Sequence, residues 1–162
     1  APAHVTFSIT TADDGLSRKI EPGVAVSSAR FAALRAIAAA GIPAGVWINP
    51  VLPFLTDTEE NLLSLLRSSK ESGASYVITH LGMTLREGNR EYFYAALDRH
   101  FPGLSRRFAE TFGNAYFLPS PNGRRLHRVF AEECARLGLA RTFREANGII
   151  RKSGGFAQQS LL

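Results

Sequence analysis

The chain has 162 residues, 45% of them hydrophobic, which is enough to bury one core of useful size. No apolar run approaches the roughly 20 residues of a membrane helix, and the first residues, APAHVTF, have neither the basic region nor the long apolar region of a signal peptide. We therefore expect a cytoplasmic protein with no membrane partner, and because Cys134 is the only cysteine, the chain alone can form no disulfide and no cysteine-rich metal cage.

The net charge of +5 is concentrated in the C-terminal half. Residues 86–152 contain 13 Arg and Lys against 7 Asp and Glu, a balance of +6, so the rest of the chain sums to −1. A basic segment favours a polyanionic partner such as nucleic acid, although basic helices more often present only a solvated face. Charge alone leaves both interpretations open.

Residues 5–11, VTFSITT, alternate apolar and polar side chains with the period of two that predicts a strand with two different faces. The polar stretch that follows, ADDGLSRKIEPGVAV, is interpreted as a connection because Gly and Pro interrupt it. Residues 27–41 then predict an amphipathic helix with Ser27 or Ser28 as its N-cap and Gly41 as its C-terminal stop.

The same order repeats further along the chain. AGVWINPVLP is a nearly continuous apolar strand, which is typical of a strand covered on both faces. TDTEENLLSLLRSSKESG predicts a capped helix, and SYVITHLGMTL predicts a third apolar strand. Strands joined by helical crossovers run parallel in right-handed units, and repeats of about 30 residues are the unit of a (βα) barrel or an open doubly wound sheet.

From Arg86 onward the pattern becomes helical. REYFYAALDRHF, LSRRFAETFG and RRLHRVFAEECARLGL predict three helices, and NAYFL is the one further candidate strand. The composition of the last residues, KSGGFAQQSLL, is typical of a flexible tail. The predicted organisation is an α/β fold with a βαβαβ segment over residues 1–85, a helical extension over 86–152 and a tail over 153–162. Three parallel strands do not close a barrel, so we expect the C-terminal portion of a larger fold.

In parallel α/β folds the chemistry gathers where the strands end. The polar residues at these ends are Ser8, Thr10, Thr11, Asp13 and Asp14, the segment 49–57, and Thr79, His80 and Thr84. Each also has an ordinary structural explanation, as a turn, a helix cap or a lone structural histidine.

The stretch LSRKIEPG offers a further candidate. Arg18, Lys19 and Glu21 could clamp the carboxylate and hydroxyl of a small ligand, or form no more than a surface ion pair. The sequence contains no phosphate-binding glycine loop, no Ser-His-Asp spacing and no His pair at metal-ligand spacing.

Several of these motifs together resemble a known family. FSITT, LSRKIEP, the helix end AGIP and the strand end PVLPFLTD resemble the second half of the radical S-adenosylmethionine enzymes related to spore photoproduct lyase. LREGNREYFYAALDRHFPGL, GNAYFLPSPN and FAEECARLGL resemble the helical C-terminal region of one branch of that family. The likeness covers nearly the whole chain, and it rests on the combination of motifs because no single one is specific.

The resemblance implies a partial (βα)6 TIM-like barrel whose first strand carries a C-x3-C-x2-C motif. The three thiolates of that motif hold a [4Fe–4S] cluster, which binds S-adenosylmethionine and cleaves it to a 5′-deoxyadenosyl radical. This chain has only Cys134 and lacks the motif. Its first strand would then be the fourth strand of the barrel, and the fragment alone is expected to be inactive and to bind neither iron nor S-adenosylmethionine appreciably.

The resemblance also assigns S-adenosylmethionine-binding roles to residues of three segments. Phe54 stands where relatives often have glycine, and Asn49 where they often have alanine, while the catalytic residues stay unassigned. The cofactor-binding candidates are Ser8 and Thr10 on the first strand, Arg18, Lys19 and Glu21 in the following loop, and Asn49, Pro50 and Val51 at the end of the second strand.

The expected partners follow from the same interpretation. The parent enzyme is a lyase-like protein with DNA lesions as a candidate substrate, in a DNA-repair setting, and the alternative is a basic helical module that binds nucleic acid without catalysis. Gln158, Ser160 and Leu161 in the tail resemble part of the motif that docks on the bacterial sliding clamp. An unpaired edge on the first strand would favour self-association.

Overall fold

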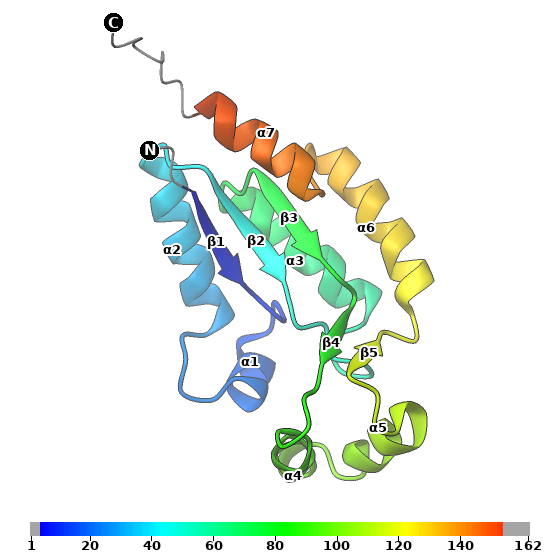
Figure 1. Cartoon of the computed structure of the whole chain (residues 1–162). Helices are drawn as coiled ribbons and strands as arrows, with labels where there is room; N and C mark the ends of the chain where they lie inside the picture. Colours follow the sequence, from blue (N-terminus) through cyan, green and yellow to red (C-terminus); the bar gives the residue numbers. More distant parts are fainter. Residues whose placement is uncertain (1–3, 154–162) are drawn as a thin grey trace, which may run out of the picture.

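The computed structural model describes residues 4–153, which form a mixed α/β structure (Figure 1). The strands are β1 (Val5–Ser8), β2 (Ala44–Ile48), β3 (Tyr76–Thr79), β4 (Gly82–Thr84) and β5 (Phe117–Pro119). The helices are α1 (Asp14–Ile20), α2 (Ser27–Ala39), α3 (Glu59–Glu71), α4 (Arg90–His100), α5 (Leu104–Phe112), α6 (Gly123–Leu137) and α7 (Phe143–Ser153). Across this range no helix is both long and apolar enough to cross a membrane.

Strands β1, β2 and β3 form a three-stranded sheet in that order, and both pairs are parallel. Val5 faces Ala44 across the first pair, and Gly45 faces Tyr76 across the second. The three predicted parallel strands with helical crossovers are therefore confirmed. Within residues 4–153 the outer edge of β1 has no strand partner, and self-association through that edge stays a prediction.

One face of the sheet carries the larger hydrophobic core, which we call the sheet core. Its strand residues alternate along the chain, as Ala44, Val46 and Ile48 do on β2. Helices α2, α3 and α6 supply most of the rest, together with residues of the connecting segments, and Figure 1 shows α3 behind the sheet. The buried residues of the sheet core are Ile9, Phe31, Leu34, Ala44, Val46, Ile48, Val51, Leu62, Leu65, Leu66, Ala74, Val77, Leu81, Leu126, Phe130, Cys134 and Leu139.

The opposite face of the sheet is partly covered by α7. Ala146 of α7 packs with Tyr76 and Ile78 of β3, and Trp47 of β2 lies beside them. Because β3 is the strand nearest to α7, the polar side chains of β1 on this face remain exposed. The sheet is thus covered on both faces only at β2 and β3, where the sequence predicted continuous apolar strands.

The third predicted strand is divided in two. It breaks at His80 and Leu81, where Leu81 has a positive φ of 48°. After the break, β4 leaves the parallel sheet and pairs antiparallel with β5, so that Met83 faces Leu118. The predicted strand NAYFL is present in shortened form as Phe117–Pro119.

The interpretation of residues 12–26 as a connection without regular structure was wrong, because it contains helix α1. Asp13 is the N-cap of this helix, and its Oδ1 accepts a hydrogen bond of 2.8 Å from the Leu16 amide. The cap of α2 was also misplaced. Val26 occupies the N-cap, while the Ser28 amide and hydroxyl both donate to the carboxylate of Asp14. These serine hydrogen bonds join the two helices instead of capping one.

The three helices predicted after Arg86 are confirmed, and α4 and α5 build a second hydrophobic core with β4 and β5. We call it the α4–α5 core. Its buried residues are Leu52, Met83, Leu85, Leu97, Phe108 and Leu118, and the half-buried residues around them are Ile20, Phe54, Leu55, Phe93, Tyr94, Phe101, Leu104 and Phe112. The predicted tail and its clamp-like residues Gln158, Ser160 and Leu161 lie outside the described residues.

Candidate functional site

The loops that follow the three parallel strands meet at one end of the sheet (Figure 1). The amide of Ile9, after β1, donates to the carbonyl of Trp47 at 3.0 Å, and the amide of Val51, after β2, donates to the carbonyl of Gly82 at 3.0 Å. Backbone hydrogen bonds therefore fix the segment after β1 to β2, and the segment after β2 to the start of β4. This is the end of a parallel sheet at which ligands usually bind.

Asn61 on α3 holds the first two loops together. Its Nδ2 donates to the carbonyls of Thr10 at 3.2 Å and Thr56 at 3.0 Å. Its Oδ1 accepts from the Thr11 hydroxyl at 3.0 Å and from the Ala12 amide at 3.1 Å. All hydrogen-bonding groups of the Asn61 side-chain amide are thus used in structure. This role was missed from the sequence because three of its four partners lie about fifty residues away.

A cavity of about 230 Å³ lies between these loops, α1 and α4. Four of the predicted cofactor-binding residues line it, namely Thr10, Lys19, Glu21 and Pro50. The structure therefore brings together residues that follow β1 and a residue that follows β2. The remaining lining residues are Ile20, Leu52, Met83, Phe93, Ala96, Leu97 and Phe101.

Thr10 is the buried polar group of this cavity. Only 1% of the residue is exposed, and its Oγ1 has no hydrogen-bond partner among residues 4–153. A buried hydroxyl without a partner costs roughly 1–3 kcal/mol. The Oγ1 atom itself is fully buried, so the cofactor-binding role of Thr10 stays a prediction.

The predicted cluster of Arg18, Lys19 and Glu21 does not form one clamp. Glu21 pairs with Arg30 at 3.3 Å, and Arg30 also donates to the carbonyl of Ser8 at 2.7 Å. Arg18 is exposed and does not line the cavity. Lys19 lines it, and its Nζ lies 6.0 Å from the ring centre of Phe101. Arg30, which was not among the residues chosen from the sequence, is the ion-pair partner of Glu21.

Three other predicted residues lie near the cavity but outside its lining. Ser8 is exposed at the end of β1. Asn49 is half-buried and joined to Pro50 by a cis peptide bond. Val51 is 3% exposed and belongs to the sheet core, so its side chain is structural and its amide is bonded to Gly82.

Phe54 has a backbone conformation that is typical of glycine. Its φ is 66°, in the left-handed region that favours glycine. Its ring is held by Phe108, with ring centres 5.4 Å apart, and by the Arg107 guanidinium 3.9 Å from the ring centre. Packing in the α4–α5 core thus compensates for the backbone strain.

Asp57 forms a buried polar cluster beside the cavity loops. It is 2% exposed, and its Oδ2 accepts a hydrogen bond of 2.8 Å from the Ser120 hydroxyl. Asn122 Nδ2 donates to the Asp57 carbonyl at 3.1 Å. Burial raises the pKa of the Asp57 carboxyl above its ordinary value, while the Ser120 hydrogen bond limits the rise. The cluster ties the loop after β2 to the loop after β5.

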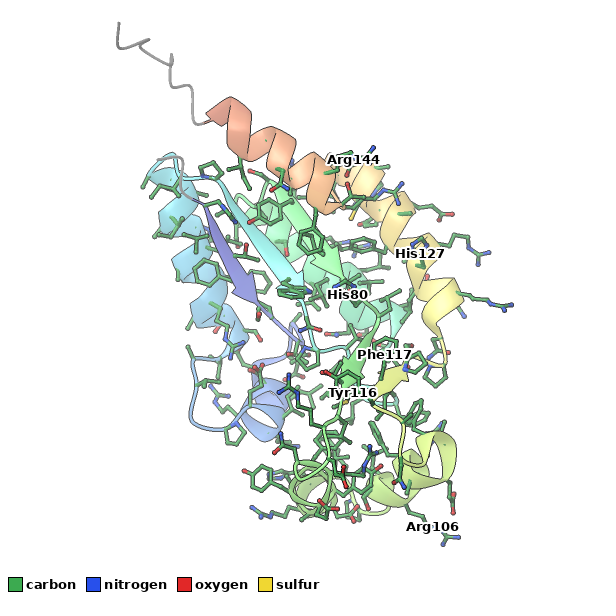
Figure 2. All side chains as sticks on the ribbon, viewed as in Figure 1. His80, Arg106, Tyr116, Phe117, His127 and Arg144 are labelled. Carbon is green, nitrogen blue, oxygen red and sulfur yellow. The ribbon has the colours of Figure 1, made fainter. Side chains whose placement is uncertain are left out.

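Of the three candidates near β3, Thr79 and His80 have structural contacts, and Thr84 is exposed on β4. The Thr79 hydroxyl donates to the Ile48 carbonyl at 3.1 Å and accepts from the Leu81 amide at 3.2 Å. His80 is exposed, with its ring centre 5.9 Å from that of Trp47 (Figure 2). Thr79 therefore stabilises the turn between β3 and β4, and His80 lies on the surface at the strand end.

Neither a metal site nor a reactive thiol is found in the described part of the chain. No three His, Cys, Asp or Glu residues within 4–153 are placed to hold a metal ion. Cys134 is buried in the sheet core, and burial raises the pKa of its thiol to about 12. The thiolate form that reacts or binds metal is thus strongly disfavoured.

Comparisons with known proteins give relatives without an assigned function. No family model matches the chain. It is 36% identical over 145 residues to Uncharacterized protein Rv2578c of Mycobacterium tuberculosis and to Uncharacterized protein Mb2609c of Mycobacterium bovis. The similarity covers 90% of this chain and 42% of each relative, so the chain spans less than half the length of the proteins it resembles.

Proposed function

We propose that this chain is the C-terminal half of a partial (βα)6 barrel in a radical S-adenosylmethionine enzyme similar to the spore photoproduct lyase group. The observation that carries the proposal is the cavity at the strand ends, which is lined by Thr10, Lys19, Glu21 and Pro50. Sequence resemblance chose these residues independently of the fold. The parallel order β1-β2-β3 and the greater length of the mycobacterial relatives are consistent with it.

The described residues fit the two cofactors differently. They contain no metal-binding group, so a [4Fe–4S] cluster would be held by residues outside 4–153. S-adenosylmethionine has charged and polar groups that Lys19 and Glu21 at the cavity lining could bind. Together the two cofactors supply a 5′-deoxyadenosyl radical that abstracts hydrogen. In the proposal this chain binds and orients one side of S-adenosylmethionine and excludes water from it.

The test uses the longer protein of which this chain would be one part. That protein is produced in the cytoplasm of an expression host, where a cluster can be assembled. After anaerobic reconstitution we expect iron and sulfide in the ratio of a [4Fe–4S] cluster, and reductive conversion of S-adenosylmethionine to 5′-deoxyadenosine. The 162-residue chain is the matched control and should do neither. A longer protein that takes up no cluster would contradict the proposal.

A second candidate function is nucleic-acid binding without catalysis, favoured by two arginines of α6. Arg124 and Arg128 are four residues apart, so they share one helix face, and both are exposed with no ion-pair partner in the described range. Three other arginines of the extension are paired: Arg106 with Glu110 at 2.7 Å, Arg125 with Glu59, and Arg136 with Glu133. Figure 2 labels Arg106. The basic excess is thus only partly free to contact phosphates.

Oligonucleotide binding to the 162-residue chain separates the two functions. If the chain is a binding module, single- or double-stranded DNA binds with strong salt dependence, and the double change Arg124→Gln and Arg128→Gln weakens binding about tenfold. Arg106→Gln is the control and should have little effect. Salt-dependent binding together with no cluster in the longer protein would favour the binding module.

A further inference from the structure

We propose that the open edge of β1, together with a groove beside it, is the docking surface for one extended segment of the longer protein. That segment pairs with β1 as a strand and places one large aliphatic side chain in the groove. The proposal rests on the proposed function only in that both require a longer protein, and it involves no cofactor. It is carried by the difference between the two edges of the three-stranded sheet.

The edge at β3 is already covered by this chain. The Val77 amide donates to the Ala140 carbonyl at 2.8 Å, and the Ala140 amide donates to the Ser75 carbonyl at 3.1 Å. Ala140 thus forms a parallel bridge beside Tyr76, and α7 follows and packs on β3. Because these backbone groups are taken, a further strand is blocked at this edge.

The edge at β1, the outermost strand of the sheet in Figure 1, is open. The amides of Val5 and Ile9 donate to carbonyls on the β2 side. Successive residues of a strand direct their backbone groups to opposite edges, so Thr6 and Ser8 face outward. Arg30 already donates to the Ser8 carbonyl at 2.7 Å. Within residues 4–153 the amides of both residues and the carbonyl of Thr6 have no partner, and a docked strand would satisfy them.

The groove lies between α7 and the open face of the sheet, and its volume is about 200 Å³. Thr6 lines it from β1, Trp47 from β2, and Ala146 and Ile150 from α7. Paired residues on neighbouring strands direct their side chains to the same face, about 5 Å apart. A residue paired with Thr6 therefore has its side chain at the groove. Since most lining side chains are apolar, an aliphatic side chain gains the most from burial there.

Tyr76 forms a flat aromatic surface across the sheet. A Cβ atom on Gly45 of β2 would collide with the ring of Tyr76, so the ring lies directly on the glycine. The Tyr76 hydroxyl forms a hydrogen bond of 2.6 Å with the Thr6 hydroxyl. The ring thus extends from β3 over β2 to β1, and it lines the groove. Because these contacts fix its position before any segment docks, the entropic cost of docking is lower.

The size of the relatives indicates the same polypeptide as the source of the segment. The similarity covers 42% of each mycobacterial relative, so more than half of each lies outside it. β1 has only four residues, and its few free backbone groups give a separate molecule little affinity. A segment of the same polypeptide has a high effective concentration and needs much less. A second copy of this chain is therefore the weaker candidate, and the first experiment detects it.

The first experiment measures amide hydrogen exchange by NMR in the 162-residue chain and in the longer protein. We expect the amides of Thr6 and Ser8 to exchange at least about tenfold more slowly in the longer protein, because a docked strand accepts their hydrogen bonds. Val5 and Ile9 are the internal reference, since both are bonded on the β2 side. Equal rates for Thr6 and Ser8 in the two proteins would overturn the proposal. Slowing in the 162-residue chain that increases with its concentration would assign the edge to a second copy and would also overturn it.

Thr6→Pro removes an outward amide and leaves the bonds to β2 in place, since proline is tolerated on an edge strand. Thr6→Val is the matched control, because both variants lose the hydroxyl that is bonded to Tyr76. In the 162-residue chain the two variants should unfold within about 2 °C of each other, whereas in the longer protein Thr6→Pro should unfold about 4 °C below Thr6→Val. The same difference in both proteins would overturn the proposal.

Asn147→Phe fills the groove from α7, where Asn147 is exposed and lines it. The ring should raise the unfolding temperature of the 162-residue chain by about 2 °C and lower that of the longer protein, because it competes with the docked side chain. Arg144→Phe places the same ring on an exposed position of α7 outside the lining, and this control should change neither protein. A rise in both proteins would show that the groove stays empty and would overturn the proposal.

The cluster experiment on the longer protein is independent of these measurements. Docking of the segment without a cluster would refute only the radical enzyme. A cluster without docking would refute only the docking surface.

Discussion

The sheet core and the α4–α5 core differ in both composition and burial. In the described range, the sheet core joins 17 buried residues, most of them aliphatic, from β2, β3, three helices and the segments that connect them. The α4–α5 core has six buried residues, and the eight around them are only half-buried. Its centre is Phe108, which is 0% exposed and lies 5.4–6.4 Å from the ring centres of Phe54, Phe93, Tyr94 and Phe112.

The two regions therefore contribute differently to folding. Burial of aliphatic side chains from elements far apart in the sequence makes the sheet core the cooperative unit. The α4–α5 core is a smaller satellite whose half-buried rings gain less from leaving water. The candidate cavity lies between them, since Thr10 follows the sheet and Leu97 belongs to the α4–α5 core. Its shape therefore depends on how firmly the satellite is held.

The largest effect is expected from Leu65→Ala in the sheet core. Leu65 is 0% exposed on α3, and removal of a buried leucine side chain typically lowers the free energy of unfolding by about 3–4 kcal/mol. Because this core is the cooperative unit, amide hydrogen exchange should become faster in both regions. Faster exchange confined to α3 would contradict the interpretation of the sheet core as the cooperative unit.

A smaller and more local effect is expected from Phe108→Ala. The substitution removes the central ring of the α4–α5 core and should cost about 3 kcal/mol. Hydrogen exchange should become faster in α4 and α5 while the amides of β1, β2 and β3 stay protected. Loss of protection throughout the sheet would show that the two regions fold as one unit.

Phe54 tests the balance between backbone strain and ring packing in the satellite. Phe54→Gly loses the ring contacts with Phe108 and Arg107 but relieves a positive φ of 66°, for a net loss of about 2 kcal/mol. Phe54→Ala loses the same ring and keeps the strain, so it should be about 1 kcal/mol less stable than Phe54→Gly. Chemical denaturation of the two variants gives the order of their free energies of unfolding. If Phe54→Ala proves more stable than Phe54→Gly, the backbone at this position is not strained.

The sheet region was the easier of the two to predict from sequence. Three apolar strands separated by capped, periodic helices specify parallel neighbours almost by pattern alone, because period and spacing are local properties. Helix α1 was missed because Gly15 and the polar residues around it resemble a loop, and its cap by Asp13 is a single side-chain hydrogen bond. The break at Leu81 was missed because a single residue with a positive φ does not change the apolar pattern of the predicted third strand.

From the sequence, the candidate site could be predicted only as separate residues at the end of each strand. Sequence placed Thr10 and Pro50 near the ends of neighbouring strands, and parallel strands bring such ends together. It could not give the pairing of Glu21 with Arg30 or of Asp57 with Ser120, since these depend on how separate helices and loops dock. Ser120 lies 63 residues from Asp57, and only the PSPNG turn signalled that a polar loop was there.

The smallest effect is expected where the two regions meet, at Asp57. Burial raises the pKa of this carboxyl in the folded chain above the value in the unfolded chain. The contribution of Asp57 to stability is therefore full below the unfolded pKa of about 3.9 and is lost as pH rises through the higher folded value. Above that value the charged form carries a constant desolvation cost, partly offset by Ser120 and by the charge of Arg107.

Asp57→Asn should remove this pH dependence, because an amide stays neutral and its oxygen can still accept the hydrogen bond from Ser120. At pH 7 the free energy of unfolding should rise by no more than about 1 kcal/mol, and at pH 3.5 it should be unchanged. Ser120→Ala is the opposing control, since loss of the donor to a buried carboxylate lowers stability most at neutral pH. Denaturation at a series of pH values measures both variants. If Asp57→Asn proves destabilising at pH 7, the charged carboxylate with its hydrogen bond from Ser120 stabilises the junction between the two cores by more than the burial of its charge costs.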